Sequence, residues 1–385
     1  MTVDVDGTCA ARFDNVRNAF IKNFTDNGDV GAAVAVTHRG EMVVDLWAGN
    51  VEGARPGAWQ RDTIVNVFST TKGMTALCAH VLIDRGQLDL DAPVARYWPE
   101  FAQAGKADIP VRWLLSHRAG LSAIREPLPI DALFDWDRMC DALARCEPWW
   151  EPGTASGYHS VTFGFLVGEV IRRITGRSVG TFFREEIADP LDVDFFIGVP
   201  VSEQHRVADL IVPPGGARPG IPTGAHPSVQ AMHNPVIGDD VVNSEQWRGA
   251  EIPAANGHGT ARGLARVYGA LANGGQIDGV RLVSPASIER MREPQPEGVD
   301  LFMGHALGGI AFRWNPGFMP NLRGVVYGPN PRAFGHNGHG GSVAMCDPEA
   351  QISVAYVMNR MQVASPDNPP DTRSISLVHA AFACP

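Results

Sequence analysis

Ser69-Thr70-Thr71-Lys72 places a hydroxyl and an amine three residues apart at the start of a predicted helix. Residues at this spacing lie on one face of a helix, so the two side chains can meet. The chain has only three lysines, which makes a chance Ser-x-x-Lys pattern rare. A serine hydroxyl is unreactive at neutral pH unless a neighbouring group takes its proton. We therefore interpret Ser69 as a candidate nucleophile and Lys72 as its candidate base. The alternative is a lysine on a solvated helix face.

The residues around this motif favour a catalytic role for Ser69 and Lys72 over a solvated helix face. Apolar residues between positions 64 and 68 lead into it, and apolar residues with helical spacing follow it up to Arg85-Gly86, a typical helix end. Ser69 would lie in the first turn of this helix, where free N–H groups and the helix dipole favour a negatively charged oxygen. Burial beside the apolar helix would lower the pKa of Lys72 toward that of a usable base.

The composition limits the classes of partner. With 385 residues and 44% hydrophobic content, the chain can bury one large core or two closely packed ones. Its net charge of −10 argues against nucleic acid and anionic membrane surfaces as partners. No run approaches 18 apolar residues, so we expect no membrane span.

The cysteines and the first residues of the chain indicate a reducing compartment. Six cysteines are scattered without Cys-x-x-Cys or zinc-ligand spacing, which is typical of free thiols. Cys140 and Cys146 are the one pair we consider for a disulfide, and free thiols are the favoured state. Residues 1–9 contain no positive segment followed by an apolar run, so we expect no secretory signal and a cytoplasmic protein.

The order of predicted elements indicates an α/β (α+β) fold. Two hairpins are predicted, Ala32–Thr37 with Met42–Ala48 and Ser342–Cys346 with Ile352–Met358, and Ala306–Trp314 is a further strand candidate. The helical patterns fall mostly between the hairpins: Lys72–Arg85, Trp113–Ser116, Asp131–Arg145, Val161–Ile174, Thr260–Ala272 and Pro285–Met291.

This order predicts an antiparallel sheet that is flanked by helices and assembled from both ends of the chain. We assign residues 1–68 and 280–385 to a discontinuous sheet domain and residues 69–279 to an inserted, mainly helical domain. The active site is expected at their junction. Residues 200–253 are rich in Pro and Gly and lack periodicity, so they are predicted to form long loops that cover a site.

Two further stretches offer polar groups to Ser69. Glu151–Ser160 contains Pro-Gly and Ser-Gly pairs that would fix a loop and present Tyr158 as the third group for proton transfer. A tyrosine packed in the core is the alternative. Phe334–Ser342 is rich in glycine and leads into a strand, which allows the backbone to approach a ligand closely.

In their order and separation, these motifs resemble the serine β-lactamase and penicillin-binding-protein superfamily. The resemblance is greater to its class C-like branch, which includes the family VIII carboxylesterases. It rests on Ser69-Thr-Thr-Lys72, Tyr158-His-Ser160 and His336-Asn-Gly338, and it covers about residues 15–362. Supporting matches are Gly86–Pro93, Leu114–Leu121, Asn256–Thr260 and Asp347–Glu349.

The resemblance implies a β-lactamase-like fold and a role for each motif residue. Ser69 would be the acylated nucleophile, and Lys72 and Tyr158 would share the general base and acid work. Which of the two deprotonates Ser69 stays open. The backbone N–H groups of Ser69 and His339 would form the oxyanion hole, and His336 would stand where β-lactamases have the lysine of Lys-Thr-Gly.

The departures from the family pattern favour an ester substrate. Ser160 replaces an Asn that is common in β-lactamases, and His336 replaces a permanently charged lysine; Gly338 retains the glycine of that motif. Both replacements weaken recognition of a β-lactam amide and carboxylate. We therefore expect a serine carboxylesterase that cleaves short-chain or small carboxylic esters. A β-lactamase, a D-Ala-D-Ala peptidase or another amide hydrolase on the same residues is the first alternative, and a non-catalytic ligand-binding relative is the second.

Other readings of the sequence are weaker. Gly176-Arg-Ser178-Val-Gly180 matches Gly-x-Ser-x-Gly, but it follows a helix end where a nucleophile elbow requires a strand. His336 and His339 have no acidic or cysteine partner nearby in sequence, so no metal and no cofactor are expected. An apolar acyl or alcohol pocket is expected to be lined by Trp149, Trp150, Leu133, Phe134 and Trp136. Packing of these side chains in the core is the alternative. The expected partner is a small-molecule ester, and the oligomeric state is left open.

Overall fold

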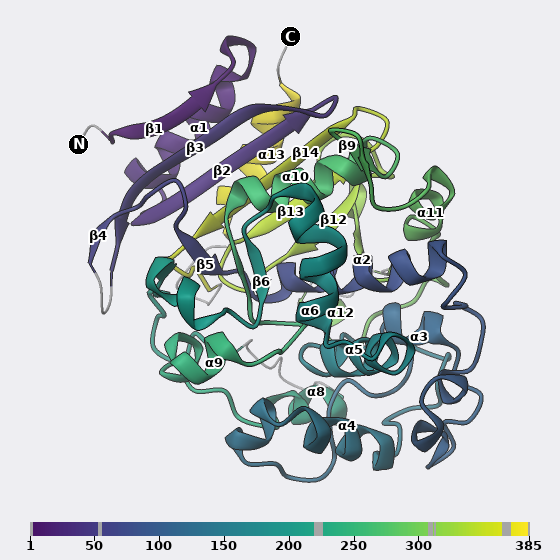
Figure 1. Cartoon of the computed structure of the whole chain (residues 1–385). Helices are drawn as coiled ribbons and strands as arrows, with labels where there is room; N and C mark the ends of the chain where they lie inside the picture. The colour runs from purple at the N-terminus through teal and green to yellow at the C-terminus, as the bar shows by residue number, and fades with distance from the viewer. Residues whose placement is uncertain are drawn as a thin grey trace.

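The structure of the chain is a computed structural model that describes residues 3–52, 56–218, 226–306, 311, 313–363 and 371–383. The predicted strand at Ala306–Trp314 lies largely outside these residues. Figure 1 shows a twisted sheet packed above a mainly helical region. No helix within the described ranges is long and apolar enough to cross a membrane.

The large sheet is built from the two ends of the chain. Its strand order is β1-β3-β2-β14-β13-β12-β11, and all neighbours pair antiparallel. In sequence order the strands are β1 (Val5–Cys9), β2 (Gly31–His38), β3 (Glu41–Val51), β11 (Met319–Pro320), β12 (Phe334–Asn337), β13 (Val343–Asp347) and β14 (Ile352–Met358), and β4 (Gly57–Ala58) extends β3. Both predicted hairpins are confirmed.

The centre of the sheet joins residues that are far apart in sequence. Strand β2 pairs with β14 over seven positions, from Ile352 opposite His38 to Met358 opposite Ala32. Every residue of β14 is buried, so this strand is covered on both faces and is uniformly apolar except for Ser353. The predicted assembly of the sheet from both termini is therefore correct.

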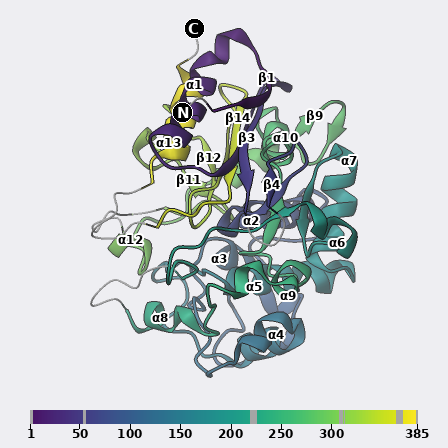
Figure 2. The same cartoon turned by 90° about the vertical axis from the view of Figure 1, so that its left-hand side faces the viewer.

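Helices cover both faces of the sheet. Figure 2 shows α1 (Asp14–Thr25) and α13 (Arg373–Phe382) on one side and α10 (Ala261–Ala272) on the other. The pattern of apolar residues predicts α10 but neither terminal helix. Because α10 packs on the sheet although it lies between residues 69 and 279, the predicted inserted domain is not purely a separate helical layer. The division into two domains stays a prediction.

The helical region surrounds α2 (Thr71–Asp84), which is buried from Thr71 to Ile83. The other helices are α3 (Val111–Leu115), α4 (Trp136–Arg145), α5 (Thr162–Thr175), α6 (Val179–Phe183), α7 (Asp189–Leu191), α8 (Pro227–Gln230), α9 (Glu245–Gly249), α11 (Pro285–Met291) and α12 (Met303–Ala306). Two small sheets complete the fold, β6 (Phe195–Ile197), β8 (Gly257–Gly259), β5 (Ile64–Asn66) and β7 (Val207–Ala208) in that order, and β9 (Gln276–Ile277) with β10 (Val280–Arg281).

Local sequence signals explain several helix boundaries. The predicted helix over residues 131–145 is interrupted because the side chain of Asp135 accepts the N–H of Arg138 and caps α4. Thr260 caps α10 in the same way through the N–H of Gly263. Gly176 ends α5 in the left-handed conformation that helix ends favour.

Candidate active site

Ser69 lies in a single 3₁₀ turn, Phe68–Thr70, that leads directly into α2. The preceding residue, Phe68, has a φ of 43°, which is unfavourable for a bulky side chain by about 1–3 kcal/mol. The turn is held by long-range contacts. The N–H of Val67 donates to the carbonyl of Gly257 at 2.9 Å, and Ser342 Oγ donates to the carbonyl of Val67 at 2.9 Å. The strained turn therefore depends on packing from β8 and the residues before β13.

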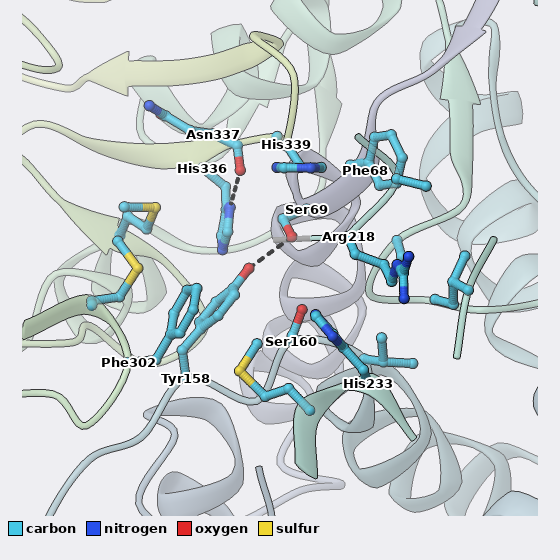
Figure 3. Close-up of a pocket in the computed structure, with 18 of the residues that line it drawn as sticks. Phe68, Ser69, Tyr158, Ser160, Arg218, His233, Phe302, His336, Asn337 and His339 are labelled. Carbon is cyan, nitrogen blue, oxygen red and sulfur yellow. Dashed lines mark hydrogen bonds between the residues drawn. The ribbon is translucent and has the colours of Figure 1, made fainter. Parts of the chain in front are cut away.

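The structure brings Ser69, Lys72 and Tyr158 together. Lys72 Nζ lies 3.0 Å from Ser69 Oγ, and Tyr158 OH donates to the same oxygen at 2.7 Å. Figure 3 shows the phenol pointing at Ser69. One hydroxyl thus contacts an amine and a phenol, as proton transfer to and from a serine nucleophile requires.

Lys72 is fully buried, and burial lowers its pKa well below the ordinary lysine value. Besides Ser69 Oγ, its amine contacts the carbonyls of Ser160 at 2.6 Å and Ala254 at 2.9 Å. A neutral amine has two N–H groups and one lone pair. The two N–H groups satisfy the two carbonyls, which leaves the lone pair to accept the proton of Ser69.

Tyr158 is buried, and its burial raises the pKa of the phenol. The phenol is therefore protonated at neutral pH and donates to Ser69. Its ring is stacked between Trp314, at 5.4 Å between centroids, and Phe302, at 6.0 Å. The buried carboxylate of Asp300 accepts the backbone N–H of Tyr158 at 3.2 Å and the indole N–H of Trp314 at 2.9 Å. This support could not be predicted from the sequence, because residues 300–314 carry no motif.

Backbone N–H groups are available for an oxyanion on the other side of Ser69. Within the described residues, the N–H groups of Ser69 and His339 donate to no protein acceptor. The imidazole of His339 is engaged instead, because its Nε2 donates to the carbonyl of Gly216 at 2.7 Å. A Cβ on Gly338 would lie 2.1 Å from the carbonyl oxygen of Val67, so this glycine lets the loop approach the Ser69 turn.

His336 lines the pocket as a neutral imidazole. Its Nδ1 lies 2.8 Å from the carbonyl of Asn337, and a carbonyl can only accept, so Nδ1 carries the proton. Burial and the nearby Lys72 lower the pKa of His336 to about 3. Its Nε2 is buried without a hydrogen-bond partner among the described residues. The site therefore holds an uncharged acceptor at the position where the family pattern has a cation.

Ser69 opens into a cavity of about 290 Å³ with mainly apolar walls. Besides the residues named above, the walls include Phe68, Val161, Met232, Ile237, Trp247, Met303 and Met319. The Ser160 side chain lies at its edge (Figure 3). The segment 200–253 contributes several walls, which agrees with its predicted place over a site.

Trp150 is not brought to this cavity. Its indole packs against Gly157 and forms an edge contact with His159 at 6.2 Å between centroids, behind the loop that presents Tyr158. Trp150 was predicted to line the pocket from its neighbouring aromatic residues, but a cluster in sequence does not fix the direction of a side chain. Its indole N–H instead donates to the carbonyl of Ala155 at 3.1 Å and stabilises that loop.

Ser178 lies elsewhere and has a structural role. Its hydroxyl accepts the N–H of Thr181 and caps α6, and it donates to the carboxylate of Glu251 at 2.6 Å. No lysine or histidine contact accompanies it among the described residues. The Gly-x-Ser-x-Gly match is therefore not the candidate site.

An antiparallel sheet with flanking helices and a serine that contacts a buried amine and a phenol define a serine hydrolase with the β-lactamase fold. The chain belongs to the Beta-lactamase family, whose family model matches residues 17–378. The predicted superfamily is thus confirmed.

Individual relatives cover nearly the whole chain. It is 38% identical over 371 residues to Esterase/beta-lactamase LipL of Mycobacterium tuberculosis, over 93% of this chain and 83% of the relative. The structure of a family VIII carboxylesterase is 42% identical with a TM-score of 0.90, over 99% of this chain and 100% of that one. A penicillin-binding protein homolog from Caulobacter crescentus is 43% identical with a TM-score of 0.89 and the same coverage.

Proposed function

We propose that this chain is a carboxylesterase that cleaves short-chain or small carboxylic esters through an acyl-enzyme on Ser69. The observation that carries the proposal is the position of Ser69 Oγ, within hydrogen-bond distance of both Lys72 Nζ and Tyr158 OH at the wall of an apolar cavity. The names of the relatives, an esterase/β-lactamase and a family VIII carboxylesterase, support the same class of reaction.

Each group has one task in the proposed mechanism. Lys72, neutral because it is buried, takes the proton of Ser69 as its oxygen attacks the ester carbonyl. The N–H groups of Ser69 and His339 stabilise the negative oxygen of the tetrahedral intermediate. Tyr158, which keeps its proton, donates it to the departing alkoxide, and the proton on Lys72 then restores the phenol. Water hydrolyses the acyl-enzyme by the reverse sequence of proton transfers.

The walls of the cavity support a neutral ester as the substrate. Apolar side chains dominate them, and the neutral His336 offers no positive charge to a carboxylate next to the reacting carbonyl. A β-lactam or peptide substrate presents a carboxylate that a lysine at this position would bind. β-Lactam hydrolysis on the same residues remains the second candidate, because the name of the relative LipL, Esterase/beta-lactamase, gives this activity beside ester hydrolysis.

A cytoplasmic location completes the proposal. All five described cysteines are free thiols, Cys140 and Cys146 among them. Free thiols are typical of reducing compartments.

Turnover of two substrate types tests the proposal. The value of kcat/KM for p-nitrophenyl acetate or butyrate should exceed that for a chromogenic cephalosporin at least about 100-fold, or roughly 2.7 kcal/mol in transition-state binding. Equal values would favour the β-lactamase alternative. An active-site phosphonate should add mass to the peptide with Ser69 and not to the peptide with Ser178. No turnover and no labelling would indicate a non-catalytic relative.

A further inference from the structure

A buried arginine far from Ser69 in sequence contacts the loop that carries the candidate oxyanion N–H. Arg373 is the first residue of α13, and its side chain has no exposed surface. One of its terminal nitrogens donates to the carbonyl of Gly340 at 2.8 Å. Gly340 directly follows His339, whose backbone N–H faces no protein acceptor within the described residues. The contact therefore fixes the Gly340–Gly341 peptide, two peptide units after the one that carries the candidate oxyanion donor.

All five N–H donors of Arg373 have acceptors. Nε and one Nη2 hydrogen bond the carboxylate of Asp371, and the second Nη2 donor serves Gly340. The two Nη1 donors serve Asp29 Oδ1 at 2.5 Å and the carbonyl of Arg360 at 3.0 Å. Such complete use of the guanidinium fixes its orientation, because every donor would lose a partner if it rotated.

The network ties three separate segments to the loop: Asp29, residues 356–362, and Asp371 with Arg373. Asp29 precedes β2 and also accepts the hydroxyl of Tyr356, in β14, at 2.6 Å. The carbonyl of Gly340 accepts a second hydrogen bond, from the N–H of Gln362 at 3.0 Å. The central strands of the sheet and the start of α13 thus determine together where the Gly340 carbonyl lies.

Gly341 shows that the contact is built into the loop. Its φ is +130°, a conformation that side chains disfavour. A Cβ there would lie 2.6 Å from Arg373 Nη2 and 2.4 Å from Asp371 Oδ2. Only glycine lets the guanidinium and carboxylate approach the loop backbone this closely.

Stability alone gives a weak reason for such a cluster. The side chains of Asp29 and Arg373 are both fully buried, so their charges carry the cost of desolvation. Well-packed apolar residues often stabilise a core as much as a buried ion pair, or more. A guanidinium does what an apolar residue cannot, since it fixes a carbonyl in position and direction. We propose that Arg373 is a positioning residue that holds the 338–341 loop so that the His339 N–H can stabilise the oxyanion at Ser69.

The test must separate positioning from folding. Arg373→Met alone leaves the Asp29 carboxylate buried and unpaired, which can cost about 3–5 kcal/mol. The double variant Asp29→Asn with Arg373→Met removes both charges and keeps an acceptor for Tyr356. Arg292→Met is the matched control, because Arg292 is 3% exposed and paired with Glu289 and Glu349 but does not contact the loop.

In the double variant, folded by circular dichroism, we expect kcat for p-nitrophenyl butyrate to fall about 10- to 100-fold, with KM changed less than threefold. This is part of the effect of losing an oxyanion donor. A boronic acid forms a tetrahedral adduct with an active-site serine, so its affinity should fall by the same factor. Arg292→Met should lower the thermal midpoint and leave kcat and boronate affinity within threefold of the parent.

Three outcomes would overturn the inference. A folded double variant with parental kcat and boronate affinity would show that the loop needs no guanidinium. Equal loss of kcat in Arg292→Met would show a general effect of destabilisation. If the double variant does not fold, Arg373→Lys decides, because it keeps the charge but cannot serve all five acceptors, and parental kcat in it would reject the role. The inference rests on the proposed function, whose own failure would appear as absent ester turnover in the parent.

Discussion

Two of the three lysines in this chain, Lys72 and Lys106, have no exposed surface, yet their surroundings differ in one decisive respect. Lys106 Nζ contacts three carbonyl oxygens, those of Gln103, Ala144 and Cys146, at 2.7–3.0 Å. Three carbonyls match the three N–H donors of an ammonium group. Lys72 contacts two carbonyls and the hydroxyl of Ser69, a group that can itself supply a proton.

The two lysines also lie at opposite ends of helices. Lys106 receives carbonyls from the last turn of α4, where the helix dipole favours a positive charge. Lys72 lies in the first turn of α2, where the dipole disfavours it. Burial lowers the pKa of both, and that of Lys72 further. These differences indicate when a buried lysine is a candidate base. One of its carbonyl partners is then replaced by a hydroxyl, and the helix dipole opposes the positive charge of the lysine.

Replacing Ser69 removes the group that distinguishes the two lysines. In Ser69→Ala we expect kcat for p-nitrophenyl butyrate to fall on the order of 10⁴-fold or more, because no acyl-enzyme can form. The protein should keep its circular dichroism spectrum and thermal midpoint. Retention of activity within about tenfold of the parent would contradict the assignment of the nucleophile.

Matched substitutions of the two lysines should have opposite effects. Lys72→Met should lower kcat about 10³-fold, which lies within the usual range for a general base. Lys106→Met should leave kcat within threefold but lower the free energy of unfolding by about 3 kcal/mol, because three carbonyls, two of them at the end of α4, lose their donor. Urea unfolding and steady-state kinetics on both variants measure the two effects.

Tyr158→Phe tests whether the phenol acts as a unit with Lys72. Alone it should lower kcat about 10²- to 10³-fold, and together with Lys72→Met it should cost less than the product of the two, since groups that act as a unit are not additive. Multiplicative losses would indicate that Lys72 and Tyr158 act independently. A large loss of kcat in Lys106→Met without a loss of stability would contradict the structural role assigned to Lys106.

Two substitutions at His339 separate the base from the oxyanion hole. His339→Pro removes the backbone N–H and should lower kcat about 100- to 1,000-fold, whereas His339→Ala keeps this donor and should have a mild effect. Both variants must first be shown to fold, because proline can disturb the loop after β12 and alanine loses the contact with Gly216. If folded His339→Ala lost as much activity as the proline variant, the imidazole and not the backbone N–H would be the group that takes part in catalysis.

The same local rules explain how much of the site could be predicted. Ser69 and Lys72 are separated by one helical turn, and Gly and Pro punctuate the loop of Tyr158, so their spacing in sequence reflects their geometry. The sandwich of Tyr158 between Phe302 and Trp314 could not be predicted, because the three rings come together through tertiary packing alone.

The remaining features could not be predicted, because they depend on the direction of side chains and on long-range contacts. The aromatic cluster that contains Trp150 was placed at the pocket, but this indole turns toward Gly157. Arg373 carries no motif, and its contact with Gly340 joins residues 33 positions apart across the end of the sheet. The fold class followed from the two hairpins, whereas α1 and α13 lay in terminal segments whose weaker patterns were not assigned.

The last expected effect is a pH dependence of stability. Below the ordinary lysine pKa of 10.5 the unfolded chain binds a proton at Lys72, while the folded chain binds it only below its lowered pKa. Between these two pKa values the unfolded state holds more protons, so the free energy of unfolding falls as pH falls, by about 1.4 kcal/mol per pH unit for one group. The stability due to neutral Lys72 is fully present above pH 10.5 and is lost as pH falls through the folded pKa.

Lys72→Met should therefore flatten the change in the free energy of unfolding between pH 10 and pH 7, relative to the parent. Lys106→Met should flatten it less, because the pKa of Lys106 is lowered less. Urea titrations at one-unit pH intervals would measure both slopes. If Lys106→Met removed more of the slope than Lys72→Met, the lysine held by three carbonyls would be the one that folds neutral, and the physical basis for choosing Lys72 as the base would be lost.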